Sequence, residues 1–246
     1  MSGFVDRLRA GRTSRLLLVA LALGGTLPTA ALAQGPTMER LSDERSSTAW
    51  AYVETPGPVR GEPSLLARAV GRVSSHTFTG SSDIVLVLGR STEDAGAWSF
   101  VRYPGLGART GWMPTAALSE VQTVSTRLVI DRRARRVRLY RGGSPIFSAR
   151  VGIGARGSPT PGGASYVRER IVLRRRGGIY GVLAFGISAY SRQRTDWPGG
   201  GQVGIHGTNQ PELIPGRISN GCVRLRNADI RRLGRLMPVG TPISIE

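Results

Sequence analysis

The sequence has very little cysteine, because Cys222 is the only one in 246 residues. A single thiol cannot form a disulfide within the chain, which excludes a small domain held together by disulfides. Histidine is scarce as well, and only His76 and His206 are present. Two distant histidines and one cysteine cannot assemble a zinc site, and no Gly-rich phosphate-binding loop precedes a helix. We therefore expect neither a metal ion nor a cofactor.

Lysine is absent and aromatic residues are few. All 34 basic residues are arginines, against 16 acidic ones, and the formal net charge is +18. Such a surface attracts polyanions, which outside a cell include wall polymers and membrane phosphates as well as nucleic acid. Aromatic residues make up only 6% of the chain and no groove-entering motif accompanies the arginines, so we expect no nucleic-acid binding. The alternative to polyanion binding is an ordinary solvated surface.

Long apolar runs are missing too, since a membrane-spanning helix needs roughly 20 apolar residues. The N-terminus instead has several arginines, a short apolar run at residues 16–23 and the triplet Ala31-Leu32-Ala33. This order predicts a secretory signal peptide over residues 1–33, cut near Ala33, with an uncleaved anchor as the alternative. We therefore expect an exported protein of the periplasm or cell wall, whose residues 34–47 form a flexible leader. An unpaired thiol outside the cytoplasm suggests an intermolecular bridge or a reactive group.

Short runs of strand-forming residues, separated by turn signals, predict a mainly β fold. In the N-terminal half these runs are residues 48–54, 65–73, 83–90, 98–104 and 109–114. They favour a small β-barrel. The stretch WSFVRYPGLGARTGWMPTAALS, with its Gly-Trp-Met-Pro ending, resembles the closing hairpin of bacterial SH3-like domains. The resemblance implies an SH3-like domain over residues 48–120, in which Trp98, Tyr103 and Trp112 are core residues or, alternatively, line a peptide-binding groove.

A short polar link at residues 120–125 leads to a second β-rich block. Two alternating runs on either side of Asp131-Arg132-Arg133 predict a hairpin. Further strands are expected at residues 166–174, 181–188, 203–207 and 242–246. Only residues 227–237 have helical spacing, with apolar Ile230, Leu233 and Leu236 and with Asn227 as a candidate N-cap. The second domain is therefore expected to be β-rich with one C-terminal helix.

Cys222 and His206 are the only cysteine-histidine pair that the second domain offers, because His76 lies in the predicted SH3-like domain. A thiol becomes a good nucleophile when a base takes its proton or a nearby positive charge lowers its pKa. The loop between the two residues contains glycine and proline and can fold back between strand ends. Taken alone, the pair fits a buried thiol and a structural histidine just as well.

The stretch GIHGTNQPELIPGRISNGCVRL, residues 204–225, closely resembles the active-site signature of the L,D-transpeptidases, the YkuD-type catalytic domain. The matching residues are His206, Gly207, Ser219, Gly221, Cys222, Val223 and Arg224. The upstream VGIGARGSPTPGG resembles the family's Thr-Pro turn, and the likeness extends over residues 126–246. One position departs: Asn220 stands where the family usually has a histidine. Since asparagine carries no positive charge, we expect a higher pKa for Cys222 and a slower reaction at neutral pH.

The resemblance implies a two-step acyl transfer. Cys222 is the nucleophile, His206 the general base, and the backbone carbonyl of Gly207 orients the imidazole. The backbone N–H groups of Gly221 and Cys222 are the expected oxyanion donors. Asn220 offers amide groups near the thiol.

Other residues are expected to bind substrate or shape the site. Arg224 suits bidentate recognition of a substrate carboxylate, with a structural ion pair as the alternative. Tyr190 and Trp197 lie where the family carries a lid over the substrate, although core packing suits them equally. Ser219 is expected to shape the turn rather than act as a second nucleophile.

The function implied by the resemblance is that of an exported peptidoglycan L,D-transpeptidase, with an SH3-like module for wall binding or spacing. It would cleave the bond between the diamino acid and D-alanine in tetrapeptide stems and form 3-3 crosslinks. Its expected partners are peptidoglycan stem peptides and anionic wall polymers. One alternative is an L,D-carboxypeptidase, in which water replaces the acceptor amine. The other is a non-catalytic wall-binding protein with a degenerate site.

Overall fold

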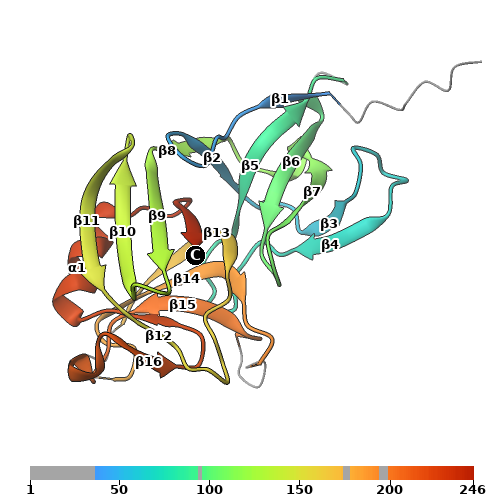
Figure 1. The fold of residues 1–246 in the computed structure, drawn as a ribbon. Helices are drawn as coiled ribbons and strands as arrows, with labels where there is room; N and C mark the ends of the chain where they lie inside the picture. Colours follow the sequence, from blue (N-terminus) through green and yellow to red (C-terminus); the bar gives the residue numbers. More distant parts are fainter. Residues whose placement is uncertain (1–36, 94–95, 174–177, 194–198) are drawn as a thin grey trace, which may run out of the picture. The chain divides into compact units, whose positions relative to one another are not determined.

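The computed structural model describes residues 37–93, 96–173, 178–193 and 199–246, all within one compact unit, Gly35–Glu246. The predicted signal peptide and Trp197 lie outside these ranges. The described chain forms two β-sheets and one α-helix (Figure 1), which confirms the expected mainly β fold. No helix in the described ranges is long and apolar enough to cross a membrane.

The N-terminal sheet has eight strands in the order β4-β3-β7-β6-β5-β2-β8, with β1 paired to β5. They are β1 (Met38–Arg40), β2 (Thr48–Tyr52), β3 (Gly57–Arg60), β4 (Ala69–Val73), β5 (Ile84–Ser91), β6 (Trp98–Tyr103), β7 (Arg109–Pro114) and β8 (Gln122–Val124). The continuous apolar run of β5 is buried on both faces: Val85 and Val87 pack in the core of this sheet, whereas Ile84 and Leu86 pack with Tyr166 of the second sheet. This pattern is typical of a strand covered on both sides.

The predicted flexible leader and the predicted polar link each contain a strand of this sheet, so the expectation that they lack regular structure was wrong. Within the predicted leader, residues 34–47, strand β1 pairs with β5 and the buried Ser42 hydroxyl donates to the Val87 carbonyl at 2.6 Å. Within the predicted link, residues 120–125, strand β8 pairs with β2. Both pair through backbone groups, which need no apolar periodicity. Glycine at residue 89 allows the backbone of β1 to lie close to β5, since a Cβ at residue 89 would stand 2.5 Å from the Glu39 carbonyl oxygen.

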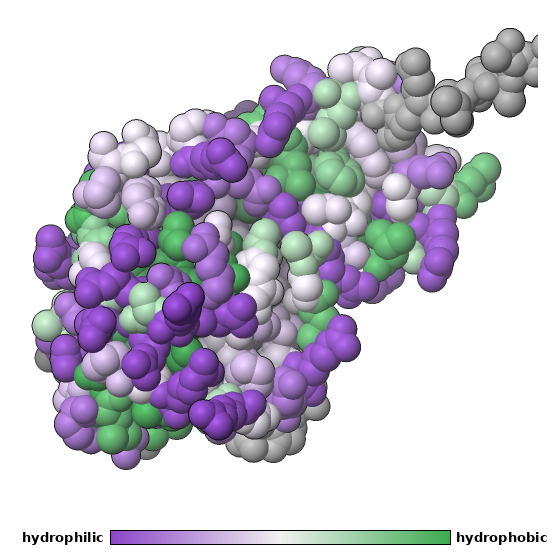
Figure 2. Space-filling model, viewed as in Figure 1, coloured by the Kyte–Doolittle hydropathy of each residue, from purple (hydrophilic) through white to green (hydrophobic). Residues whose placement is uncertain are grey.

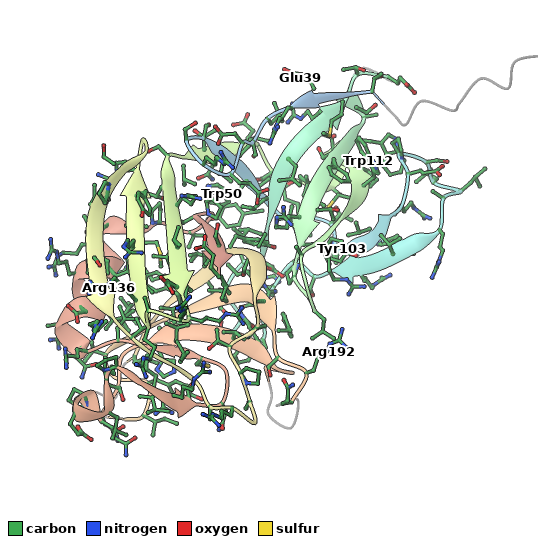
Figure 3. The ribbon with its side chains drawn as sticks, in the orientation of Figure 1. Glu39, Trp50, Tyr103, Trp112, Arg136 and Arg192 are labelled. Carbon is green, nitrogen blue, oxygen red and sulfur yellow. The ribbon has the colours of Figure 1, made fainter. Side chains whose placement is uncertain are left out.

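The predicted hairpin of this sheet is present as the antiparallel pair β6 and β7. The side chains of Trp98, Tyr103 and Trp112 are all buried, which favours their interpretation as core residues over a peptide-binding groove. Figure 3 shows Tyr103 and Trp112 on these strands. The strand expected at residues 65–73 begins later, at Ala69, and Leu66 before it is 97% exposed. The SH3-like identity of this sheet remains a prediction.

The second sheet has ten strands in the order β11-β10-β9-β18-β13-β14-β15-β17-β12-β16. They are β9 (Thr126–Asp131), β10 (Arg136–Arg141), β11 (Ser144–Arg150), β12 (Gly152–Gly154), β13 (Gly163–Val172), β14 (Leu183–Tyr190), β15 (Gln202–His206), β16 (Gly216–Ser219), β17 (Val223–Arg224) and β18 (Pro242–Ile245). Strands β9 and β10 form the hairpin expected around residues 131–133. The strands predicted from alternation in this half are all present.

Helix α1 (Asn227–Leu236) is the predicted C-terminal helix, and its Ile230 and Leu233 are buried in the core. The predicted capping role of Asn227 was wrong, because the N-cap is Arg226 and no side chain caps the helix. Asn227 instead holds the backbone of Thr208: its Oδ1 accepts from the Thr208 N–H at 3.2 Å and its Nδ2 donates to the Thr208 carbonyl at 2.9 Å. The side chain that resembled a cap therefore ties α1 to the chain that follows β15.

Side chains of β13 connect the second sheet to β5. The Tyr166 hydroxyl donates to the Ile84 carbonyl at 2.9 Å. Arg168 forms a buried ion pair with Asp83, in which its Nε donates to Oδ1 at 2.9 Å. Removing one partner of a buried ion pair leaves an uncompensated charge and destabilises the fold, so replacing either Arg168 or Asp83 alone should weaken the packing of β13 against β5. The residue that follows Arg168 in β13 is Glu169, which lines the pocket described below, so the position of β13 determines where this carboxylate lies.

Candidate functional site

A pocket of about 470 Å³ lies over one face of β13, β14 and β15. Strand register places Ile171, Ala184 and His206 in one row across the three strands. The neighbouring row consists of Glu169, Gly186 and Gly204. Directly opposed residues of antiparallel strands point to the same face of the sheet, so both rows face the pocket. The central positions are alanine and glycine, and their small size leaves room for a ligand above the sheet.

Cys222 lies at the rim of this pocket, in the turn between β16 and β17. Gly221 before it has φ +112°, a backbone conformation that favours glycine. The Ser219 hydroxyl closes the turn, since it donates to the Cys222 carbonyl at 2.5 Å and accepts from the Gly221 N–H at 3.2 Å. The Cys222 Sγ accepts from the Gly204 N–H at 3.4 Å. The thiol is therefore held against the backbone of β15.

His206 ends β15, and its side chain is only 3% exposed. Its Nδ1 lies 2.6 Å from the Gly207 carbonyl oxygen. A carbonyl only accepts hydrogen bonds, so Nδ1 carries the proton and Nε2 is left as the basic nitrogen. A Cβ at residue 204 would stand 3.7 Å from His206 Cδ2 and 3.8 Å from Cys222 Sγ, so the imidazole and the thiol flank the same glycine.

Gly207 has no room for a side chain. A Cβ at this position would stand 2.2 Å from Asn227 Oδ1 and 3.2 Å from Gly181 Cα. Glycine at residue 207 is therefore what allows Asn227 to hold the segment whose carbonyl orients His206.

Replacing Gly207 with alanine is expected to displace Asn227 and lower the free energy of unfolding by about 1–3 kcal/mol, as overpacking generally does. The same change should shift the carbonyl that orients His206 and slow acylation of Cys222. Thermal unfolding and intact-mass kinetics measure the two effects. Gly157→Ala is the matched control, since a Cβ there meets nothing within 4 Å. Equal melting temperatures for the two variants would contradict the steric account.

Burial controls the charge state of the pair. It lowers the pKa of His206 to about 4; Arg224 lowers it further, while the Gly207 hydrogen bond opposes the change. Burial also raises the pKa of the Cys222 thiol, against the Gly204 N–H and Arg224, which lower it. At neutral pH the resting pair is therefore a neutral thiol beside a neutral imidazole. Burial is the largest cause of this rise, so the expected effect of Asn220 on the pKa of Cys222 stays a prediction.

Arg224 lies opposite His206 in the parallel pairing of β15 and β17, and it is half-buried. Its Nε is buried without a hydrogen-bond partner, and within the described ranges Arg224 forms no ion pair. The alternative of a structural ion pair therefore finds no partner in the described part of the chain. Arg224 does not line the pocket itself, so recognition of a substrate carboxylate remains a prediction.

The residues of the turn before Cys222 differ in exposure. Asn220 is exposed and lines the pocket, whereas Ser219 is buried and shapes the turn as expected. The Gly221 N–H, a predicted oxyanion donor, is engaged by the Ser219 hydroxyl in this structure. The Gly221 N–H could donate to an oxyanion only if this hydrogen bond were broken, so it is not a free donor here.

Tyr190 does not lie over the pocket, so its predicted role in covering the substrate was wrong. Its hydroxyl accepts a hydrogen bond from Arg168 Nη1 at 3.0 Å, at the far end of β14 from Ala184. An aromatic residue that does line the pocket beside His206 is Tyr180, which no sequence pattern indicated: its ring centroid lies 4.9 Å from that of the imidazole in an edge-on arrangement. Both tyrosines sit in glycine-containing segments near β14, so composition alone does not distinguish them. The other predicted lid residue, Trp197, lies outside the described residues.

Glu169 and Gln202 also line the pocket and were not predicted as site residues. Glu169 lies within the strand expected at residues 166–174, Gln202 directly precedes the strand expected at residues 203–207, and no local motif marks either of them. Among the described residues, no group of three or more His, Cys, Asp or Glu side chains could hold a metal ion.

The second half of the chain is similar to known proteins. A family model described as the YkuD L,D-transpeptidase catalytic domain matches residues 125–245. The YkuD protein of Bacillus licheniformis is 29% identical over 126 residues, which cover 50% of this chain and 67% of that protein. The YkuD protein of Bacillus subtilis is 27% identical over 128 residues, which cover 52% of this chain and 70% of that protein.

A solved structure is also similar. The NMR structure of the catalytic domain from an E. faecium L,D-transpeptidase has 23% sequence identity and a TM-score of 0.37, and the match covers 49% of this chain and 96% of that one. The family model and the two YkuD proteins match the part of the chain that carries Cys222 and His206. Residues 125–245 of this chain therefore belong to the L,D-transpeptidase (YkuD) catalytic-domain family.

Proposed function

We propose that this protein is an exported peptidoglycan L,D-transpeptidase that works through an acyl-enzyme on Cys222. It cleaves the bond between the diamino acid and D-alanine of a tetrapeptide stem and joins two stems in a 3-3 crosslink. The observation that carries the proposal is the placement of the Cys222 thiol and the His206 imidazole around Gly204 in one pocket. The Gly207 carbonyl at His206 Nδ1 leaves Nε2 available as a base.

In the first half-reaction, Cys222 Sγ attacks the carbonyl carbon of the diamino acid while its proton passes to His206 Nε2. The carbon–nitrogen bond to D-alanine then breaks, and Nε2 returns the proton to the leaving amine. Free D-alanine departs and a thioester remains on Cys222. Because the pKa of His206 is lowered to about 4, its protonated form is a strong acid suited to this proton return.

In the second half-reaction, the neutral side-chain amine of another stem attacks the thioester carbonyl. His206 Nε2 takes a proton from the attacking nitrogen and gives it to the departing sulfur, so the thiol is restored. The product is an amide between two diamino acids. If water attacks in place of the amine, the same steps yield a tripeptide stem, which is L,D-carboxypeptidase activity.

The remaining parts of the chain take supporting roles in this proposal. Residues 1–33 act as the signal peptide, and the N-terminal sheet is an SH3-like module for wall binding or spacing. The net charge of +18 supports attraction to anionic wall polymers. Hydrophilic residues spread over much of the visible face, interleaved with apolar ones (Figure 2). The stem peptides are the proposed substrate and partner.

Product analysis tests the proposal. Purified tetrapeptide muropeptides are incubated with the mature protein and separated by liquid chromatography with mass detection. Dimers that have lost one D-alanine are the expected result. Tripeptide stems without dimers would assign the carboxypeptidase instead. Unchanged substrate, together with a Cys222 thiol that alkylates no faster than free cysteine, would favour the wall-binding alternative.

A further inference from the structure

A buried carboxylate shares the pocket with the thiol and the imidazole. Glu169 is only 2% exposed. Its Oε2 accepts hydrogen bonds from the hydroxyls of Thr77, at 2.7 Å, and Thr79, both from the loop between β4 and β5. Its Oε1 receives only a long contact of 3.4 Å from Gln202 Nε2. The N-terminal part of the chain thus holds one oxygen of a carboxylate that lines the catalytic pocket.

The register of the sheet directs this carboxylate toward the site. Glu169, Gly186 and Gly204 are directly opposed across β13, β14 and β15. A Cβ at residue 186 would stand 2.5 Å from both Glu169 Oε1 and Gln202 Nε2, so glycine at this position makes room for these two side chains. Two spacings between neighbouring strands separate Glu169 from Gly204 by about 10 Å at the backbone. The Cys222 thiol lies directly at Gly204.

One buried acceptor atom beside Glu169 lacks a donor within the described residues. Gln202 is 4% exposed, and its Oε1 is buried without a hydrogen-bond partner among the residues that the structure describes. The orientation of its amide follows from Glu169, because only Nε2 can face a carboxylate. Within the described ranges, no arginine or histidine forms an ion pair with Glu169. A buried carboxylate without an ion-pair partner and a buried amide oxygen without a donor are both costly, and one positively charged hydrogen-bond donor between them would satisfy both.

We infer that Glu169 and Gln202 form a subsite for the side-chain ammonium of the diamino acid in the acyl donor, an inference that rests on the proposed function. An ammonium has three donors and no acceptor, which matches the two acceptor groups. The apolar side chains of Ile171 and Ala184 occupy the adjoining row and suit the methylene stem of such a residue. When the ammonium binds Glu169, the stem extends back toward the carbonyl carbon at Cys222.

The acceptor amine does not fit this subsite. It must be neutral to attack the thioester, whereas a buried carboxylate favours the charged form of an amine. It must also reach the carbonyl carbon on Cys222, two strands away from Glu169. The subsite therefore selects the donor stem, and Thr77 and Thr79 act as positioning residues for it.

The experiment compares two donors on wild type and on Glu169→Gln. One is the tetrapeptide muropeptide, and the other is the same molecule with its side-chain amine acetylated, which removes the charge. The readout is the ratio of kcat/KM values for release of D-alanine. We expect wild type to prefer the free amine by about 10- to 100-fold, as charged hydrogen bonds generally allow, and Glu169→Gln to bring the ratio close to 1. A purely steric effect of the acetyl group would persist in the variant.

Two further variants complete the test. Glu212→Gln, at an exposed residue of the short 3-10 helix Pro211–Leu213, is the matched control and should keep the wild-type ratio. Gln202→Met removes the unpartnered acceptor, leaves Glu169 in place and should lower the ratio, which provides the answer if Glu169→Gln does not fold. Equal rates for both donors on wild type, or an unchanged ratio in the variants, would overturn the subsite alone. No D-alanine release from either donor would overturn the proposed function and this inference with it.

Discussion

Replacement of Cys222 by alanine is expected to abolish every acyl-transfer activity of the protein, with a fall in kcat of about 10⁴-fold or more. The variant has no atom that can form the thioester, while the pocket and His206 stay in place. Within the described part of the chain the thiol takes part in one hydrogen bond, from the Gly204 N–H at 3.4 Å, so its removal should cost little stability. Loss of activity with a retained melting temperature would thus identify Cys222 as the nucleophile.

Intact mass after incubation with a carbapenem measures this directly, because an opened β-lactam is an acyl-enzyme mimic that the family is expected to form. A one-to-one adduct should appear on wild type and be absent from Cys222→Ala. Tetrapeptide muropeptides serve as the second substrate for both proteins. Crosslinking by Cys222→Ala, or an adduct on it, would refute the mechanism.

The rate of acylation is expected to keep its neutral-pH value down to about pH 5 and then to fall through an apparent pKa near 4. His206 must be unprotonated to accept the thiol proton, and burial lowers its pKa from 6.5 to about 4. Rates of acylation between pH 3.5 and 8, read by intact mass, give the profile directly. A fall in rate centred near pH 6.5 would mean that His206 is solvated in the working enzyme.

The same shift predicts a pH dependence of stability. Between pH 6.5 and 4, His206 is protonated in the unfolded chain and stays mostly unprotonated in the folded chain. The free energy of unfolding should therefore decrease as the pH falls through this window, by on the order of 3 kcal/mol in total, and be unaffected by this residue above pH 6.5. Urea denaturation at several pH values measures the effect.

His206→Gln separates both effects from other titrating groups. It should slow acylation by about 10²–10⁴-fold, the usual contribution of a general base, and should also remove this part of the stability change. His76→Gln is the matched control, since His76 lies between β4 and β5 and its side chain, within the described ranges, forms one hydrogen bond, with the neighbouring Ser75 hydroxyl at 3.1 Å. Identical pH profiles for His206→Gln and wild type would remove His206 as the base.

Local patterns in the sequence predicted much of the fold. Alternating residues gave the hairpin of β9 and β10, and the spacing of Ile230 and Leu233 gave helix α1. Strands β1 and β8 were not predicted, because backbone pairing to β5 and β2 holds them and their sequences show no apolar alternation. Asn227 was misread for a related reason: its side chain contacts Thr208, nineteen residues away, rather than its own helix.

Cys222, His206 and Gly207 could be named from the chain alone, because their chemistry depends on residue type and on a short motif that survives in linear order. Burial by the whole fold, which no local pattern encodes, lowers the pKa of His206 and raises that of Cys222. The register of three strands likewise brings Glu169 into the row of Gly186 and Gly204, and Glu169 and Gln202 both line the pocket. Dielectric environment and strand register arise from contacts between distant segments, so they exist only once the chain has folded.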